Sequence, residues 1–240
     1  MFRILVIRYL NLFRICNFGF GILINIMLIT LLFSQPLLFA SIFLALVISI
    51  TFHEFFHVLT ARLLGDETGE RMGRLTMNPL VHLDLWGTLA IIFIGFGWGN
   101  PAPFNPYNLK NQKYGPALVA FGGPFSNFLL IVFFGIILKI LYPILGQENY
   151  LTIFLQALVG FNGVLMVFNL IPLPPLDGSH ILKAILPERF QYINNYLDQY
   201  GAKILFGLIL ISFIFNISIF GFIITPIIRL ISGILGVPLL

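Results

Sequence analysis

The residues best suited to chemistry are His53, Glu54 and His57, which stand in the order His-Glu-Phe-Phe-His. On an α-helix, residues four apart lie on one face, so His53 and His57 can bind the same metal ion. Glu54 would then lie beside the open coordination position, where a carboxylate can act as a general base toward water. The spacing predicts a zinc-dependent hydrolase.

Apolar residues flank this motif on both sides, from 39 to 50 and from 58 to 65. The motif therefore lies inside a membrane-length helix, where ionisable side chains are costly and are usually functional. Two simpler interpretations are a pair of hydrogen-bonded core histidines and a buried His–Glu pair. Three ionisable groups in hydrocarbon need a common partner, however, and a divalent cation is the simplest one.

A catalytic zinc site needs a third protein ligand. We select Asp177, because it follows a proline-rich break inside an apolar run, where a carboxylate must have a partner. His180 can share a helical face with Asp177 and is the second choice, as a ligand or as a hydrogen-bonding neighbour. We expect Glu148 on the far side of the membrane, and His82 and Asp84 in a solvated loop.

Two asparagines lie in apolar surroundings. Asn127 follows a Gly-Pro break, and Asn169 precedes the prolines before Asp177. An asparagine in a dry site can donate a hydrogen bond to a developing oxyanion, and it can equally join two helices. Both roles stay open for Asn127, and we favour the structural role for Asn169.

The overall composition predicts a helical integral membrane protein, since 59% of the 240 residues are hydrophobic and only 9% are charged. Cys16 is the single cysteine, so a zinc site must use nitrogen and oxygen ligands. The net charge of +4 is small and the cations are spread over the loops, which argues against a nucleic-acid partner.

The hydrophobic pattern predicts an all-α polytopic membrane protein with about five to six transmembrane helices. The segment 85–97 is too short to cross, so we expect it to be re-entrant, which keeps Asp177 on the same side as the histidines. We expect the amphipathic segment 179–200 to lie on the cytoplasmic surface. The expected spans are 17–33, 37–64, 114–141, 150–171 and 201–225.

These spans predict one membrane-embedded domain over residues 1–240, because no stretch between them is long enough for a separate soluble core. Within it we distinguish an additional N-terminal span (1–36), a catalytic core (37–200), and a C-terminal span with a tail (201–240). The positions of Arg and Lys favour a cytoplasmic N-terminus and a multi-pass protein of the cell membrane.

Four segments carry a resemblance to a known family. His53-Glu-Phe-Phe-His57, Gly123-Pro-Phe-Ser-Asn127 and Asn169-Leu-Ile-Pro-Leu-Pro-Pro-Leu-Asp-Gly178 together resemble the site-2 protease family of intramembrane zinc metalloproteases. The segment 73–88 is similar to the compact prokaryotic branch of that family, which lacks PDZ and CBS domains.

The resemblance implies a set of roles. His53, His57 and Asp177 would bind one zinc ion per chain, Glu54 would be the catalytic base, and Asn127 would lie near the active site. It also implies a membrane-embedded β-hairpin after the second span.

The predicted function is hydrolysis of peptide bonds in or near transmembrane segments of substrate proteins within the lipid bilayer. The alternative is a non-proteolytic metal transporter or scaffold on the same fold. A transporter would need ionisable residues through both leaflets, whereas those seen here cluster toward one side. The sequence does not determine the oligomeric state.

Overall fold

The computed structural model describes residues 31–94, 97–215 and 217–239. Most of the predicted N-terminal span lies outside these residues. In the described part, four segments are long and apolar enough to cross a membrane: Pro36–Leu63, Gly115–Leu145, Tyr150–Asn169 and Glu188–Phe215. The prediction of an all-helical, multi-pass membrane protein is thus confirmed, whereas the count of five to six spans is not.

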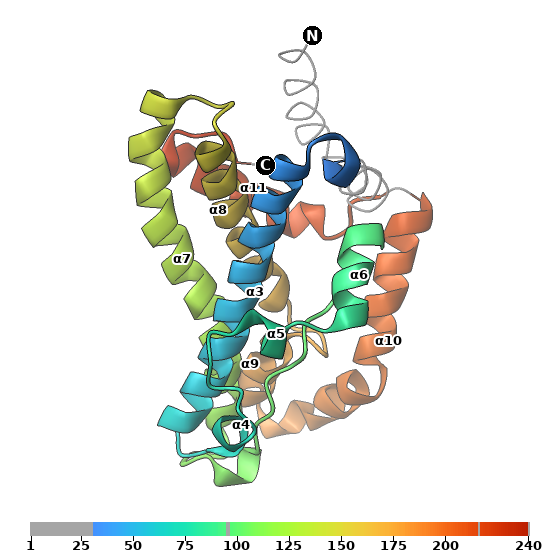
Figure 1. The fold of residues 1–240 in the computed structure, drawn as a ribbon. Helices are drawn as coiled ribbons and strands as arrows, with labels where there is room; N and C mark the ends of the chain where they lie inside the picture. The colour runs from blue at the N-terminus through green and yellow to red at the C-terminus, as the bar shows by residue number, and fades with distance from the viewer. Residues whose placement is uncertain (1–30, 95–96, 216, 240) are drawn as a thin grey trace.

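Helices account for nearly all of the regular structure (Figure 1). In chain order they are α3 (Pro36–Leu63), α4 (Thr68–Arg71), α5 (Pro79–His82), α6 (Leu85–Ile94), η1 (Pro106–Asn108), α7 (Gly115–Leu145), α8 (Tyr150–Asn169), α9 (Asp177–Ile185), η2 (Glu188–Phe190), α10 (Gln191–Phe215) and α11 (Gly221–Leu235).

Helices α3, α7 and α8 pack against one another and form the centre of the molecule, while α9 packs on α7 and α11 packs on α7 and α8. Ala45 of α3 meets Leu158 of α8 in one buried cluster, and Leu138 of α7, Val159 of α8 and Ile228 of α11 meet in a second. Close packing of this kind holds helices together where lipid removes the hydrophobic driving force between them.

The predicted re-entrant β-hairpin is not found. Residues 85–94 form helix α6, and the described residues contain a single antiparallel bridge, between Leu83 and Gly99, and no strand. The apolar run favours a helix because the Asp84 carboxylate accepts a hydrogen bond from Gly87 N (2.7 Å) at its first turn. Ten residues of helix are about 15 Å long, half of a bilayer core, and the bridge brings the two ends of the segment together.

The C-terminal part also differs from the expected pattern. We predicted a surface helix ending at 200 and a span over 201–225, but α10 continues without a break from Gln191 to Phe215. Gly201 does not end the helix because it serves packing instead: a Cβ there would lie 2.7 Å from Pro174 Cδ. The break comes after Phe215, and α11 follows as a shorter helix of 15 residues.

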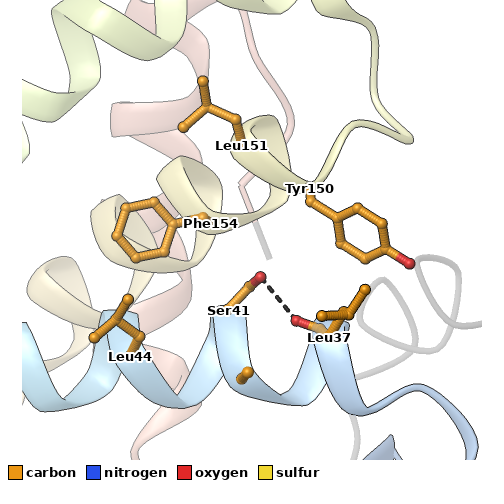
Figure 2. Close-up of a pocket in the computed structure, with 7 residues that line it drawn as sticks. Leu37, Ser41, Leu44, Tyr150, Leu151 and Phe154 are labelled. Carbon is orange, nitrogen blue, oxygen red and sulfur yellow. Dashed lines mark hydrogen bonds between the residues drawn. The ribbon is translucent and has the colours of Figure 1, made fainter.

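An apolar groove of about 430 Å³ lies between the first half of α3 and the start of α8 (Figure 2). Within it, the Ser41 hydroxyl donates to Leu37 O (2.9 Å), so the groove offers a ligand little polarity. Its nearest residue on α3 lies about 13 Å along the helix from His53. The groove is therefore separate from the predicted chemistry. Its lining residues are Leu37, Ala40, Ser41, Leu44, Tyr150, Leu151 and Phe154.

Asp66 fixes the loop that follows α3. Its buried carboxylate accepts hydrogen bonds from Thr68 N (3.1 Å), Asn105 N (2.7 Å) and Asn108 Nδ2 (2.9 Å). Burial alone would raise the pKa of Asp66, but these hydrogen bonds outweigh it and hold the pKa below its usual value. The carboxylate thereby joins the end of α3 to the segment around residues 105–108.

We expect Asp66→Asn to lower the free energy of unfolding by about 1.5–3 kcal/mol at neutral pH, because hydrogen bonds to a charged group are lost. Since the folded-state pKa is depressed, this stability is present above a pH of about 4 and is lost as the pH falls through the folded-state pKa. Thermal unfolding in detergent, followed by circular dichroism, measures both effects. Glu67→Gln is the control, because Glu67 pairs with Arg71 on the exposed surface; an equal loss in both variants would contradict the assignment.

Candidate active site

The structure brings His53, His57 and Asp177 together. His53 Nε2 and His57 Nε2 are 3.0 Å apart, and Asp177 Oδ2 lies 3.2 Å from the first and 3.4 Å from the second. Both imidazoles are buried, and the aspartate side chain is 17% exposed. Residues more than a hundred positions apart in the sequence thus place three potential ligand atoms around one point.

The other nitrogen of each imidazole has a partner on α7. His57 Nδ1 lies 2.8 Å from Val119 O, and His53 Nδ1 lies 2.7 Å from Asn127 Oδ1. A carbonyl oxygen only accepts, so His57 must donate from Nδ1, and its Nε2 carries a lone pair. Partners of this kind orient histidine ligands in metal sites.

The three converging atoms fit a metal ion. Asp177 Oδ2 is buried and receives no hydrogen bond from the described residues, and the facing Nε2 of His57 offers a lone pair rather than a proton. Electron-rich atoms this close repel one another in a medium of low dielectric constant. Zinc bonds of about 2.0–2.2 Å in a tetrahedral site place ligand atoms roughly 3.3 Å apart, which agrees with the distances found here.

Glycines on α7 allow this helix to lie directly against the histidines. A Cβ on Gly123 would lie 2.6 Å from both His53 Cε1 and His57 Cε1, and one on Gly122 would lie 2.9 Å from Phe56 O. Pro124, inside α7, has no N–H. The carbonyl of Ala120, one turn earlier and next to Val119, therefore loses its helical hydrogen bond. The Gly-Gly-Pro sequence therefore serves the contact between α7 and the motif on α3.

Asp177 reaches the histidines because it is the first residue of α9, which packs on α7. The chain turns sharply before it, through the proline-rich segment 172–175. Gly178 lies so close to Leu170 O that a Cβ there could not be accommodated. The break in the apolar run is thus what brings the carboxylate to the depth of the α3 motif.

Glu54 lies on α3 between the two histidines and is half-buried. Its Oε2 accepts a hydrogen bond from Ala102 N at 3.0 Å. Pro101 and Pro103 flank Ala102 and have no N–H, so Ala102 provides the only amide in that tripeptide. This amide orients the carboxylate.

The remaining predicted residues lie in several environments. Asn127 is fully buried, with Oδ1 near His53 and Nδ2 donating to Asn162 Oδ1 (2.7 Å). Asn169 Nδ2 bonds to Leu165 O of its own helix (3.1 Å), in line with a structural role. His180 is half-buried and its ring lies 6.0 Å from that of Phe104.

The prediction that His82 is solvated is wrong. Its side chain is 1% exposed, and its Nε2 lies 2.8 Å from Thr76 O, so it holds the loop before α5. The loop is polar in composition, which suggested solvent exposure, but it folds back onto α3.

Sequence reasoning missed four partners of the site. Val119 and Ala102 contribute main-chain atoms, which the sequence does not reveal. Asn162 and Ser49 contribute buried side chains behind Asn127. The sequence feature that could have pointed to these side chains is Asn162 itself, an amide between two glycines in the apolar run of α8.

Membrane-length helices that carry a His-His-carboxylate group beside a glutamate define a membrane-embedded metallohydrolase. Comparison with known proteins gives the family. The model of peptidase family M50 matches residues 135–212. YwhC of Bacillus subtilis (strain 168), by its name a candidate zinc metalloprotease, is 38% identical over 164 residues, which are 66% of this chain and 74% of YwhC.

Rip2 of Mycolicibacterium smegmatis, named in the same way, is 29% identical over 188 residues, 73% of this chain and 70% of Rip2. The zinc metalloprotease MJ0392 of Methanocaldococcus jannaschii is 25% identical over 186 residues, 77% of this chain and 45% of MJ0392. No solved structure gives a significant match. The chain belongs to peptidase family M50, and its resemblance to the site-2 proteases is confirmed.

Gly123→Ala should lower the zinc content of the purified protein and reduce its stability by about 1–3 kcal/mol, because the added methyl group has no space beside the two imidazoles. Metal analysis and thermal unfolding measure the two effects. Gly207→Ala on α10 is the matched control, since a Cβ there meets nothing within 4 Å. Normal zinc content in Gly123→Ala would show that α7 does not constrain the site.

Proposed function

We propose that the chain is an intramembrane zinc metalloprotease in which His53, His57 and Asp177 hold the zinc ion and Glu54 is the general base. The observation that carries this proposal is the convergence of three electron-rich atoms, 3.0–3.4 Å apart, in a buried position. Membership of a peptidase family and relatives named as zinc metalloproteases support it. The cofactor is zinc, one ion per chain.

The zinc ion that His53, His57 and Asp177 would hold would supply Lewis acidity toward a substrate carbonyl and toward water. Glu54 takes the proton of the attacking water and delivers it to the leaving amine. The hydrogen bond from Ala102 N holds one oxygen of this carboxylate, and the second oxygen is left for the water. Both histidines are buried, so the site is shielded from bulk solvent.

Asn127 has a positioning role in this proposal. The sequence suggested donation to an oxyanion or a bond between helices, and the fully buried amide makes contacts at both ends, with His53 and with Asn162. We therefore assign it to the orientation of His53, and donation to an oxyanion stays a prediction.

The membrane arrangement follows from the position of the site. His53 lies about 15 Å from the end of α3, inside the bilayer when α3 spans it. Five cations outside the described spans lie at this end, near α4 and α9 (Figure 1): Arg71, Arg74, Lys110, Lys113 and Lys183. Their position favours the cytoplasmic side of a cell membrane. In this proposal α6 enters the membrane from that side, and the chain returns to the same side, because the bridge between Leu83 and Gly99 joins the two ends of the segment.

Substrates in this arrangement are membrane proteins, cut in or near a transmembrane segment. We treat residues 1–240 as one membrane-embedded protease domain with the catalytic core in 37–200. A non-proteolytic transporter or scaffold is not favoured, because the buried ionisable cluster occupies a single depth and the family is one of peptidases.

Asp177→Ala should abolish stoichiometric zinc binding, because two imidazoles remain and a catalytic zinc site requires three protein ligands. Zinc content after purification, and rebinding after treatment with a chelator, measure this. His180→Ala is the control: it removes the second-choice ligand three residues away and should leave the zinc content unchanged. Normal zinc content in Asp177→Ala, together with a loss in His180→Ala, would assign the third ligand to His180 instead.

Glu54→Gln should keep the zinc and lower the cleavage rate by about 10²–10⁴-fold, since an amide cannot take the proton from water. Cleavage of a membrane-protein substrate in reconstituted vesicles measures the rate, and metal analysis confirms the cofactor. Glu148→Gln, in the loop between α7 and α8, is the matched control and should cut at the normal rate. Full activity in Glu54→Gln would exclude the general-base role.

A further inference from the structure

A chain of buried hydrogen bonds runs behind His53 through three helices. Asn127 of α7 lies between His53 of α3 and Asn162 of α8, with heavy-atom distances of 2.7 Å on each side. Both asparagines are 0% exposed. Buried amides at membrane depth must satisfy their donors and acceptors within the protein, so the direction of each bond is constrained.

The far end of this chain fixes the direction. Asn162 Nδ2 donates to Leu158 O (2.7 Å) and to Ser49 Oγ (2.8 Å). The Ser49 hydroxyl can accept there because its own proton goes to Ala45 O (2.8 Å). Both hydrogens of the Asn162 amide are thus used by acceptors, and only its oxygen can face α7.

The direction then propagates to the metal site. Because Asn162 presents its oxygen, Asn127 must present its NH₂ group to Asn162 and its oxygen to His53. His53 must therefore carry its proton on Nδ1, which leaves Nε2 with a free lone pair toward Asp177 and His57. A reversed Asn127 would stabilise the other tautomer, whose Nε2–H cannot bind a metal.

From this geometry we infer that Asn162, supported by Ser49, is a positioning residue that sets the tautomer of His53 through Asn127 and so tunes zinc affinity. The inference rests on the proposed zinc site. Asn162 touches neither substrate nor the ligand atoms, and its effect on catalysis passes through the imidazole.

Zinc affinity tests this inference. Asn127→Leu should weaken zinc binding by about 10–100-fold, and Asn162→Leu by about tenfold, because outer partners of histidine ligands contribute in this range. Competition with a chromophoric chelator in detergent gives both values. Binding in Asn162→Leu within twofold of the unaltered protein, alongside a loss in Asn127→Leu, would overturn the inference, since the effect would then end at Asn127.

Two buried hydroxyls provide matched controls. Ser126 precedes Asn127 on α7, and within the described part of the chain its hydroxyl bonds only to Gly123 O of its own helix, so Ser126→Ala should leave zinc affinity unchanged. Thr152 is fully buried on α8 and its hydroxyl has no partner among the described residues, so Thr152→Val should also bind normally. A tenfold loss of zinc affinity in either control would show that any change in the packing of these helices weakens zinc binding. That result would overturn the inference.

A measurement on the unaltered, zinc-loaded protein needs no variant to fold. With ¹⁵N-labelled histidine, the Nδ1 protons of His53 and His57 should each give a downfield, slowly exchanging resonance. Absence of the His53 resonance, with that of His57 present, would overturn the inference. Retention of zinc in His53→Ala would instead contradict the proposed metal site, so the two failures are distinguishable.

Discussion

Two imidazole nitrogens and one carboxylate oxygen lie 3.0–3.4 Å apart in a dry environment, and the rest of the site serves to hold these mutually repelling groups in place. Without a cation, such an arrangement is unfavourable, and the protein must oppose it by fixing each group from behind. Main-chain and amide acceptors on α7 hold the two rings, and the start of α9 holds the carboxylate. Metal binding converts this repulsion into coordination.

This constraint explains why α7 is the central helix of the site. It contributes Val119 and Asn127 as acceptors, and Gly123 as the point of closest approach. A single helix that provides both the hydrogen bonds and the space couples the orientation of the ligands to helix packing. The glycines that weaken α7 as an isolated helix are offset by the contacts that they permit.

Much of the site could be predicted from the sequence because its signals are local. The spacing of His53 and His57 defines a helical face, and a carboxylate after a proline-rich break needs a partner, which selected Asp177. The helical nature of 85–94 was missed because an apolar run of that length fits several structures, and the deciding contact is the short-range cap from Asp84. The burial of His82 depends on how a loop folds back, which composition does not encode.

Two of the groups that orient the site belong to the main chain. The peptide N–H of Ala102 holds Glu54, and the peptide oxygen of Val119 holds His57. Replacing either residue by another non-proline amino acid changes the side chain and keeps the bond. An alanine scan would thus pass over these positions, and amide-to-ester substitution is the change that would reveal them.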